Sequence, residues 1–136
     1  MKTAVIYWSG TGNTEVMANA VAEGAGTDAL TVSDFSGNIE DFEALAFGCP
    51  AMGAEVLEED EFEPFFTGIE KALSGKNVLL FGSYGWGDGE WMRNWEERVK
   101  AAGASLLGDE GYTVNEAPSD DDLAKLKALG TELAGA

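Results

Sequence analysis

A short loop near the N-terminus combines small and polar residues in a way that suits the binding of an anion. Its residues are Ser9, Gly10, Thr11, Gly12, Asn13 and Thr14. The hydroxyl and amide side chains are neutral hydrogen-bond donors, and the glycines permit tight turns and close backbone approach to a ligand. An apolar segment precedes the loop and a helical pattern follows it, so backbone N–H groups and the positive end of a helix dipole add to the attraction. The loop therefore predicts a phosphate site.

The residues near this loop restrict the kind of phosphate that it suits. It contains no lysine or arginine, whereas the P-loop of nucleotide hydrolases needs a Gly-x-x-x-x-Gly-Lys-Ser/Thr sequence. Glu15 stands in place of the third glycine of a dinucleotide fingerprint, where its carboxylate would lie close to a pyrophosphate. A single terminal phosphate fits better. The simpler alternative is an ordinary strand-to-helix turn rich in small polar residues.

Two further loops combine glycines with apolar and aromatic side chains. Residues 48–55 read GCPAMGAE and residues 82–90 read GSYGWGDGE. The glycines of the second loop keep backbone N–H groups accessible and leave Trp86 free to stand over a flat ligand. Met52, in the first loop, can cover the opposite face of that ligand with a polarizable contact.

Hydrophobic patterns along the chain predict the elements that position these loops. Short β-branched or apolar runs predict strands at residues 3–8, 29–32, 44–48 and 78–81, and an edge strand at 105–107 and 112–114 that is interrupted by 108–111. Apolar residues at helical spacing predict helices at 15–24, from 62 to about 74, from 91 to about 102, and from a Ser119 cap to Leu133. The connection between the second and third strands has room for only a short helix or none.

The alternation of strands and helices predicts an α/β fold. We expect one domain, residues 1–136, with a doubly wound five-stranded parallel sheet in the order 2-1-3-4-5 and helices on both faces. Ligands of such sheets bind beyond the carboxyl ends of the strands, near the switch point between strands one and three. The three loops described above meet at this place.

The amino-acid composition indicates which partners the protein binds and in which cellular compartment it works. Eight lysines and arginines against 25 aspartates and glutamates give a net charge of −17, which repels nucleic acids and anionic membranes and favours basic protein partners. Plain solubility or adaptation to salt explains the acidity equally well. With Cys49 as the single cysteine and no histidine, we expect no disulfide, no metal site and a reducing cytoplasm. No apolar stretch is long enough to span a membrane.

Taken together, the motifs resemble the flavodoxins, specifically the short-chain type of clostridia and other anaerobes. The resemblance runs along nearly the whole chain. It is carried by four segments: WSGTGNT at 8–14, PAMG at 50–53, EFEPF at 61–65 and FGSYGWGDG at 81–89.

The resemblance implies a non-covalent flavin mononucleotide (FMN) with its phosphate on the first loop and its ring between Met52 and Trp86. Glu55 matches the carboxylate that accepts from the ring N3–H, and the Gly53 carbonyl is expected to turn toward N5 when the semiquinone forms. Ala54 replaces a residue that is often polar in this turn. The expected cofactor-binding residues are Ser9, Gly10, Thr11, Gly12, Asn13, Thr14, Ala51, Met52, Gly53, Ala54, Glu55, Ser83, Tyr84, Gly85, Trp86, Gly87 and Asp88.

The function implied by the resemblance is low-potential transfer of single electrons between semiquinone and hydroquinone, by a monomer with no catalytic residues that docks transiently on basic redox proteins. An FMN-dependent reductase of small molecules is the alternative, but Met52 and Trp86 would fill both faces of the ring. A phosphorylated receiver module shares the strand order, yet it needs clustered aspartates where this chain has Trp8-Ser9 and Gly48-Cys49.

Overall fold

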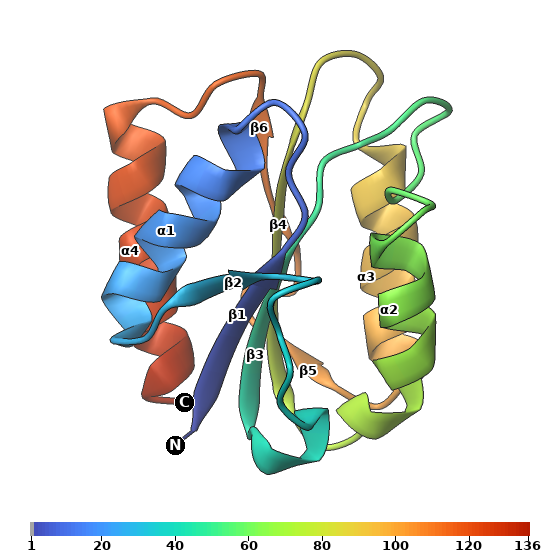
Figure 1. Cartoon of the computed structure of the whole chain (residues 1–136). Coiled ribbons are helices and arrows are strands. Elements are labelled where there is room, and N and C mark those ends of the chain that lie inside the picture. The colour runs from blue at the N-terminus through green and yellow to red at the C-terminus, as the bar shows by residue number, and fades with distance from the viewer. Residues whose placement is uncertain (1) are drawn as a thin grey trace.

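The computed structural model describes residues 2–136, and its strands and helices alternate along the chain as predicted (Figure 1). The elements are β1 (Thr3–Tyr7), α1 (Asn13–Ala25), β2 (Ala29–Thr31), β3 (Ala44–Gly48), α2 (Phe62–Ile69), β4 (Asn77–Tyr84), α3 (Glu90–Ala101), β5 (Ser105–Leu106), β6 (Tyr112–Asn115) and α4 (Asp120–Ala134).

The strands form one parallel sheet in the order β2-β1-β3-β4-β5, which confirms the predicted fold class. The edge strand is interrupted, also as predicted. Its first part, β5, pairs with β4 at Asn77 and Val78, and its second part, β6, pairs with the other end of β4, from Phe81 to Tyr84. The segment between the two parts thus bypasses the middle of β4.

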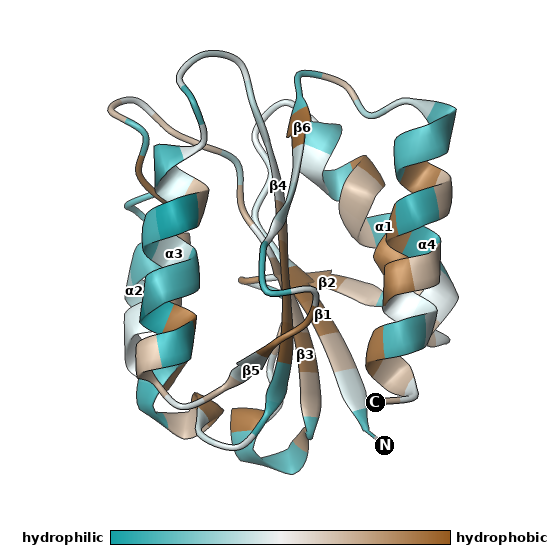
Figure 2. Ribbon diagram, turned by 180° about the vertical axis from the view of Figure 1, so that it is seen from behind, coloured by the Kyte–Doolittle hydropathy of each residue, from teal (hydrophilic) through white to brown (hydrophobic). Residues whose placement is uncertain are grey.

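Helices cover both faces of the sheet. Figure 1 shows α1 and α4 on one face and α2 and α3 on the other, and Figure 2 shows largely hydrophobic strands between helices that carry both hydrophilic and hydrophobic residues. Every residue of β3 is buried, as expected of a central strand that is covered on both sides. Two apolar clusters result, one on each face of the sheet.

One helix differs from the sequence-based expectation in length. The apolar stripe that begins at Phe62 was expected to form one helix to about residue 74, but α2 ends at Ile69 and a 3₁₀ helix, Glu70–Leu73, carries Leu73 into the core. Between β2 and β3 the chain makes only a 3₁₀ turn, Ile39–Asp41, which agrees with the expectation of a short helix or none. A burial pattern constrains which side chains face inward, but it does not distinguish the last α-helical turn from a 3₁₀ turn.

The cap predicted for the last helix is present. Ser119 Oγ accepts a hydrogen bond from the N–H of Asp122 at 3.1 Å, and Asp122 Oδ2 accepts one from the N–H of Ser119 at 2.9 Å. This reciprocal pair is a capping box, and it fixes the start of α4. No helix among residues 2–136 has the length and apolar content needed to cross a membrane.

Backbone hydrogen bonds beyond the strand ends bring the three predicted loops together. The N–H of Trp8 donates to the carbonyl of Gly48 at 3.0 Å, and the N–H of Ala51 donates to the carbonyl of Ser83 at 3.0 Å. The loops after β1, β3 and β4 therefore leave the sheet side by side at its carboxyl end.

Candidate functional site

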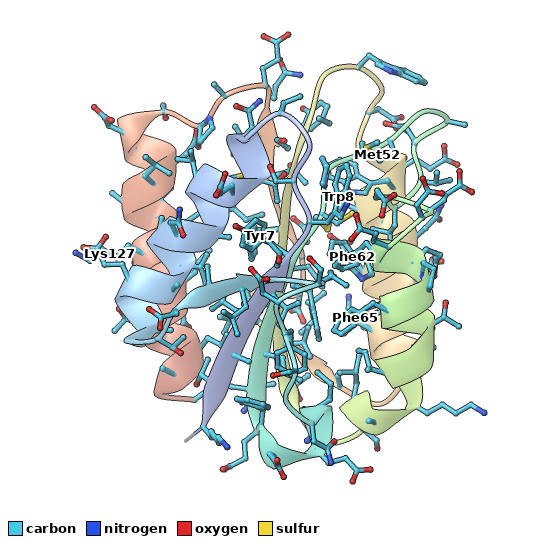
Figure 3. The ribbon with its side chains drawn as sticks, viewed as in Figure 1. Tyr7, Trp8, Met52, Phe62, Phe65 and Lys127 are labelled. Atoms are coloured by element: carbon cyan, nitrogen blue, oxygen red, sulfur yellow. The ribbon has the colours of Figure 1, made fainter. Side chains whose placement is uncertain are left out.

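A cavity of about 230 Å³ lies at the carboxyl end of the sheet, between the three loops. Figure 3 shows Trp8 and Met52 in this region, between the strand ends and α2. The cavity is lined by Trp8, Gly10, Thr11, Asn13, Pro50, Ala51, Met52, Ser83, Tyr84, Gly85 and Glu116. Residues of all three loops thus meet around one space, as the sequence predicted. Among the lining residues Glu116 is the only one that carries a charge.

The loop after β1 is shaped by Ser9. Its Oγ accepts hydrogen bonds from the N–H groups of Gly12, at 3.1 Å, and Glu15, at 3.3 Å. The hydroxyl proton of Ser9 is left to donate elsewhere. Tyr7 donates its O–H to Glu15 Oε2 at 3.3 Å and so holds this carboxylate beside β1. Burial, together with the Glu15 carboxylate, raises the pKa of Tyr7.

The start of α1, where Asn13 lines the cavity, has backbone donors without an acceptor. Gly12 precedes the helix with a φ of 100°, a left-handed conformation that favours glycine. Within residues 2–136 no backbone or side-chain acceptor binds the N–H groups of Asn13 and Thr14, the first two of the helix. The side chain of Thr14 is buried and shares a hydrogen bond of 3.3 Å with Ser83 Oγ, which ties this loop to β4.

The turn after β3 is a tight reversal between Met52 and Val56. The N–H of Met52 donates to the carbonyl of Val56 at 2.8 Å, and the N–H of Val56 donates to the carbonyl of Met52 at 3.1 Å. Gly53 has a φ of 41° and Glu55 a φ of 57°, both in the left-handed region. The conformation at Gly53 is one that β-branched residues avoid.

Glu55 connects this turn to the loop after β4. Its side chain is buried, and Oε1 accepts a hydrogen bond from the N–H of Gly89 at 3.2 Å. A Cβ atom on Gly87 would lie 1.9 Å from the same oxygen, so this glycine makes room for the carboxylate. Arg93 holds the loop from the α3 side, because it donates to the Asp88 carbonyl at 2.8 Å and to Asp88 Oδ1 at 3.0 Å.

Trp86 stands at the tip of the loop after β4 with 65% of its surface exposed. The two tryptophans of α3 are different. Trp91 is buried and donates its indole N–H to the carbonyl of Cys49 at 3.0 Å, while Trp95 packs edge-on against Phe62 and Phe66. Trp95 therefore has a packing role in the core.

The acidic residues that follow Glu55 have separate roles. Glu58 is buried, and its carboxylate accepts hydrogen bonds from the N–H groups of Asp60, Glu61 and Phe62 at 2.7–2.8 Å. Burial alone would raise the pKa of Glu58, but these three donors outweigh it and the pKa is lowered. Glu58 therefore anchors the start of α2, whereas Glu59 and Asp60 are exposed.

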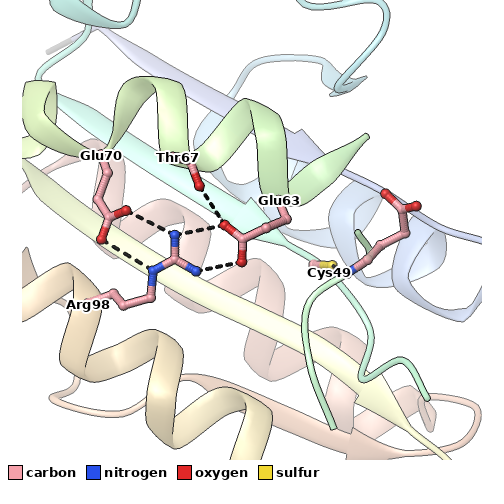
Figure 4. Close-up of polar contacts among 6 residues, drawn as sticks. Cys49, Glu63, Thr67, Glu70 and Arg98 are labelled. Atoms are coloured by element: carbon pink, nitrogen blue, oxygen red, sulfur yellow. Dashed lines mark hydrogen bonds and ion pairs between the residues drawn. The ribbon is translucent and has the colours of Figure 1, made fainter. Parts of the chain in front are cut away.

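Cys49 has a structural role in the core. Its thiol is buried, and burial raises its pKa far above the ordinary value, so the reactive thiolate is disfavoured. Figure 4 shows Cys49 near the ion-pair network in which Arg98 binds Glu63 and Glu70. Residues 2–136 contain no cluster of three or more side chains able to hold a metal ion.

A doubly wound parallel sheet, with a neutral phosphate loop beside apolar and aromatic loops, defines the class of flavin nucleotide-binding α/β proteins. Comparison with known proteins agrees with this class. The family model described as Flavodoxin matches residues 5–130. Flavodoxin of Megasphaera elsdenii is 46% identical over 138 residues, which cover 97% of this chain and 98% of the relative. Flavodoxin of Clostridium beijerinckii is 53% identical over 118 residues, covering 82% and 86%.

A solved structure supports the same assignment. The solution structure of two-electron reduced M. elsdenii flavodoxin matches with a TM-score of 0.83 and 43% identity, and covers 98% of this chain and 99% of that one. The chain belongs to the flavodoxin family. It is an FMN-binding electron-transfer protein, and it acts as a carrier rather than as an enzyme.

The cavity has the chemistry that FMN requires. Unpaired N–H groups at the start of α1 and neutral hydroxyl donors suit a phosphate, and no cation lines the space. Met52, Trp8 and Tyr84 supply apolar and aromatic walls. The residues present therefore fit the cofactor.

The predicted site residues divide into two groups. Eight of them line the cavity: Gly10, Thr11, Asn13, Ala51, Met52, Ser83, Tyr84 and Gly85. The others do not line it: Ser9, Gly12 and Thr14 make hydrogen bonds that shape the phosphate loop, Glu55 is buried and bound to Gly89, and Gly53, Ala54, Trp86, Gly87 and Asp88 lie exposed on the neighbouring turns. Three lining residues were not predicted as site residues: Trp8, Pro50 and Glu116. Trp8 and Pro50 belong to motifs that carried the resemblance. Glu116 follows the second part of the edge strand, and its position at the carboxyl edge was the only signal in the sequence.

Proposed function

We propose that the three loops hold one FMN and that the protein passes single electrons at low potential between the one-electron and two-electron reduced forms of this cofactor. Bound FMN supplies the redox chemistry, because its ring accepts electrons one at a time. The observation that carries the proposal is the cavity itself, which is lined by Asn13 at the start of α1 together with Met52 and Gly85 of the other two loops.

The proposed cofactor contacts follow from this arrangement. The phosphate binds to the loop of residues 9–14, whose donors are neutral. The ring binds between Met52 and Trp86, and the exposure of Trp86 leaves its indole face available for stacking. Glu55 accepts a hydrogen bond from the ring, and backbone groups of residues 85–87 bind its polar edge. Gly53 turns its peptide when the ring gains a proton.

The charges around the site favour a low potential. The phosphate loop has no cation, and the guanidinium of Arg93, which binds the loop after β4, is paired with Asp88. Negative charges near a ring that becomes anionic on reduction raise the free energy of the reduced state. The anchoring of FMN by neutral donors therefore avoids a positive charge that would make reduction easier.

We further propose that a single domain, acting as a monomer in the cytoplasm, docks transiently on basic redox proteins. The net charge of −17 supports electrostatic steering toward such partners. The lone cysteine is buried, which is consistent with a reducing compartment.

An ionic-strength series tests the docking proposal. The rate of electron transfer from the reduced protein to a basic redox protein is measured by stopped flow between low and high salt. We expect the rate to fall severalfold or more as salt screens the attraction, whereas a flat rate would rule out steering. Steady NAD(P)H oxidation by the purified protein, without an added reductase, would instead indicate a small-molecule reductase.

A further inference from the structure

The charged residue in the wall of the cavity, Glu116, has an unusual backbone conformation. Its φ is 61°, which is left-handed, although it is not a glycine. Such a conformation costs about 1 kcal/mol or more for a residue with a side chain, and it persists where the surrounding structure enforces it. At Glu116 the conformation turns the chain at the end of β6, so that this exposed acidic residue lies in the cavity wall with Tyr84 and Gly85.

Two hydrogen bonds fix this corner to β4. The carbonyl of Tyr84 accepts from the N–H of Glu116 at 2.7 Å and from Asn115 Nδ2 at 3.3 Å. The Tyr84–Gly85 peptide is trans, so the N–H of Gly85 points away from β6, toward the side of β4 on which β3 lies. The corner therefore sets the direction of a backbone donor in the cavity and holds Glu116 beside it.

The position of Tyr84 shows which part of the cavity Glu116 faces. Ser83, the preceding residue, is tied to Thr14 of the phosphate loop, and Gly85, the following residue, begins the loop that leads to Trp86. Glu116 therefore lies between the end of the cavity that suits a phosphate and the end that suits a ring. In FMN these two groups are joined by a sugar-alcohol chain that carries three hydroxyl groups.

The chemistry of a carboxylate indicates which group of FMN Glu116 binds. An ionised carboxylate accepts hydrogen bonds and repels a phosphate. The donors of FMN are the chain hydroxyls and the ring N3–H, and Glu55 lies on the opposite loop to receive the N3–H. We propose that Glu116 contacts the cofactor and that its carboxylate accepts hydrogen bonds from hydroxyl groups of the sugar-alcohol chain. This inference rests on the proposed placement of FMN.

Three flavins separate this contact from the alternatives. FMN has the ring, chain and phosphate; riboflavin has the ring and chain; lumiflavin has only the ring. Dissociation constants of all three are measured by fluorescence titration of the apoprotein. Glu116→Gly removes the carboxylate and tolerates the left-handed backbone. The matched control is Asp109→Gly, because Asp109 is also an exposed acid with a left-handed φ, 64°, but does not line the cavity.

We expect Glu116→Gly to raise the dissociation constants of FMN and riboflavin by the same factor, about tenfold, because a hydrogen bond to a charged group is lost. The dissociation constant of lumiflavin should not change. Glu116→Gln should weaken the binding of FMN and of riboflavin by about threefold, since an amide oxygen still accepts a neutral hydrogen bond. Asp109→Gly should leave the dissociation constants of all three flavins unchanged.

Three results for Glu116→Gly would overturn the proposal. Binding of FMN and riboflavin could be unchanged, or lumiflavin could lose as much affinity as FMN, which would indicate contact with the ring. Tighter binding of FMN alone would indicate that the carboxylate repels the phosphate. Failure of the unmodified protein to bind FMN would instead contradict the placement of the cofactor, so the two failures are distinguishable.

Discussion

The carboxylate of Glu55 accepts a hydrogen bond from the backbone N–H of Gly89, with 3.2 Å between the oxygen and nitrogen atoms. The bond joins the turn after β3 to the loop after β4, the two segments expected to enclose the flavin ring. Both segments are rich in left-handed conformations, at Gly53, Gly87 and Gly89. A single buried side chain therefore connects two segments that have little regular structure of their own.

Replacement of Gly87 by alanine should break this connection. The new Cβ would lie 1.9 Å from Glu55 Oε1 and 2.9 Å from Glu55 Cγ, so the carboxylate has to leave its place. We expect FMN affinity to fall by more than about tenfold, because a misplaced acceptor and a strained loop both act on the ring site. Isothermal titration of the apoprotein with FMN measures the effect.

Gly89→Ala serves as the control for this substitution. Gly89 has nearly the same φ, 92° against 90°, but its new Cβ would meet only Arg93 Nη1, at 3.6 Å. Backbone strain is then similar and the collision is absent. Equal loss of affinity in both variants would show that strain alone, and not the displacement of Glu55, explains the result.

Replacement of Trp86 by alanine separates cofactor binding from folding. Because 65% of Trp86 is exposed, the thermal midpoint of the apoprotein should change by no more than about 2 °C. FMN affinity should fall by about tenfold or more, since a stacking face of the ring site is lost, and Trp86→Phe should restore most of it. Unaltered affinity and potentials in Trp86→Ala would remove this residue from the site.

Glu58→Gln should destabilise the fold in a pH-dependent way. The carboxylate accepts three N–H groups, and its pKa in the folded state lies below the ordinary 4.5. The stabilisation is therefore fully present above pH 4.5 and is lost as the pH falls through the lowered pKa.

We expect a loss of about 1–2 kcal/mol in unfolding free energy at pH 7, measured by urea denaturation, that shrinks below pH 4.5. Glu59→Gln, at an exposed neighbouring acid, should change the free energy by less than about 0.5 kcal/mol. A loss of the same size at pH 3 and pH 7 would contradict the role of the charged carboxylate.

Much of this architecture follows from patterns that are local in the sequence. The apolar run from Thr3, the stripe that begins at Phe62 and the Ser119 cap each depend on neighbouring residues, so the sequence predicted the corresponding elements. Strand order followed from the alternation of elements, because parallel connections obey a fixed handedness. The phosphate loop was predicted for the same reason, since its donors are consecutive.

The residues that were missed depend on contacts between distant segments. Glu58 resembles any acid in a charged stretch until the backbone of Asp60, Glu61 and Phe62 folds around it. Glu116 reaches the cavity only because β6 pairs with the carboxyl half of β4 and the chain then turns in a left-handed conformation. Neither a turn of this kind at a glutamate nor the register of an interrupted edge strand has a local signal.

Reductive titration of the FMN-loaded protein, without oxygen and followed by visible absorbance, tests the central claim most directly. A carrier that holds the ring between Met52 and Trp86 should convert the oxidised flavin first to a stable one-electron-reduced form and then to the two-electron-reduced form, in two resolved phases. Direct conversion to the two-electron-reduced form in one phase, or a protein that does not retain FMN, would contradict the account.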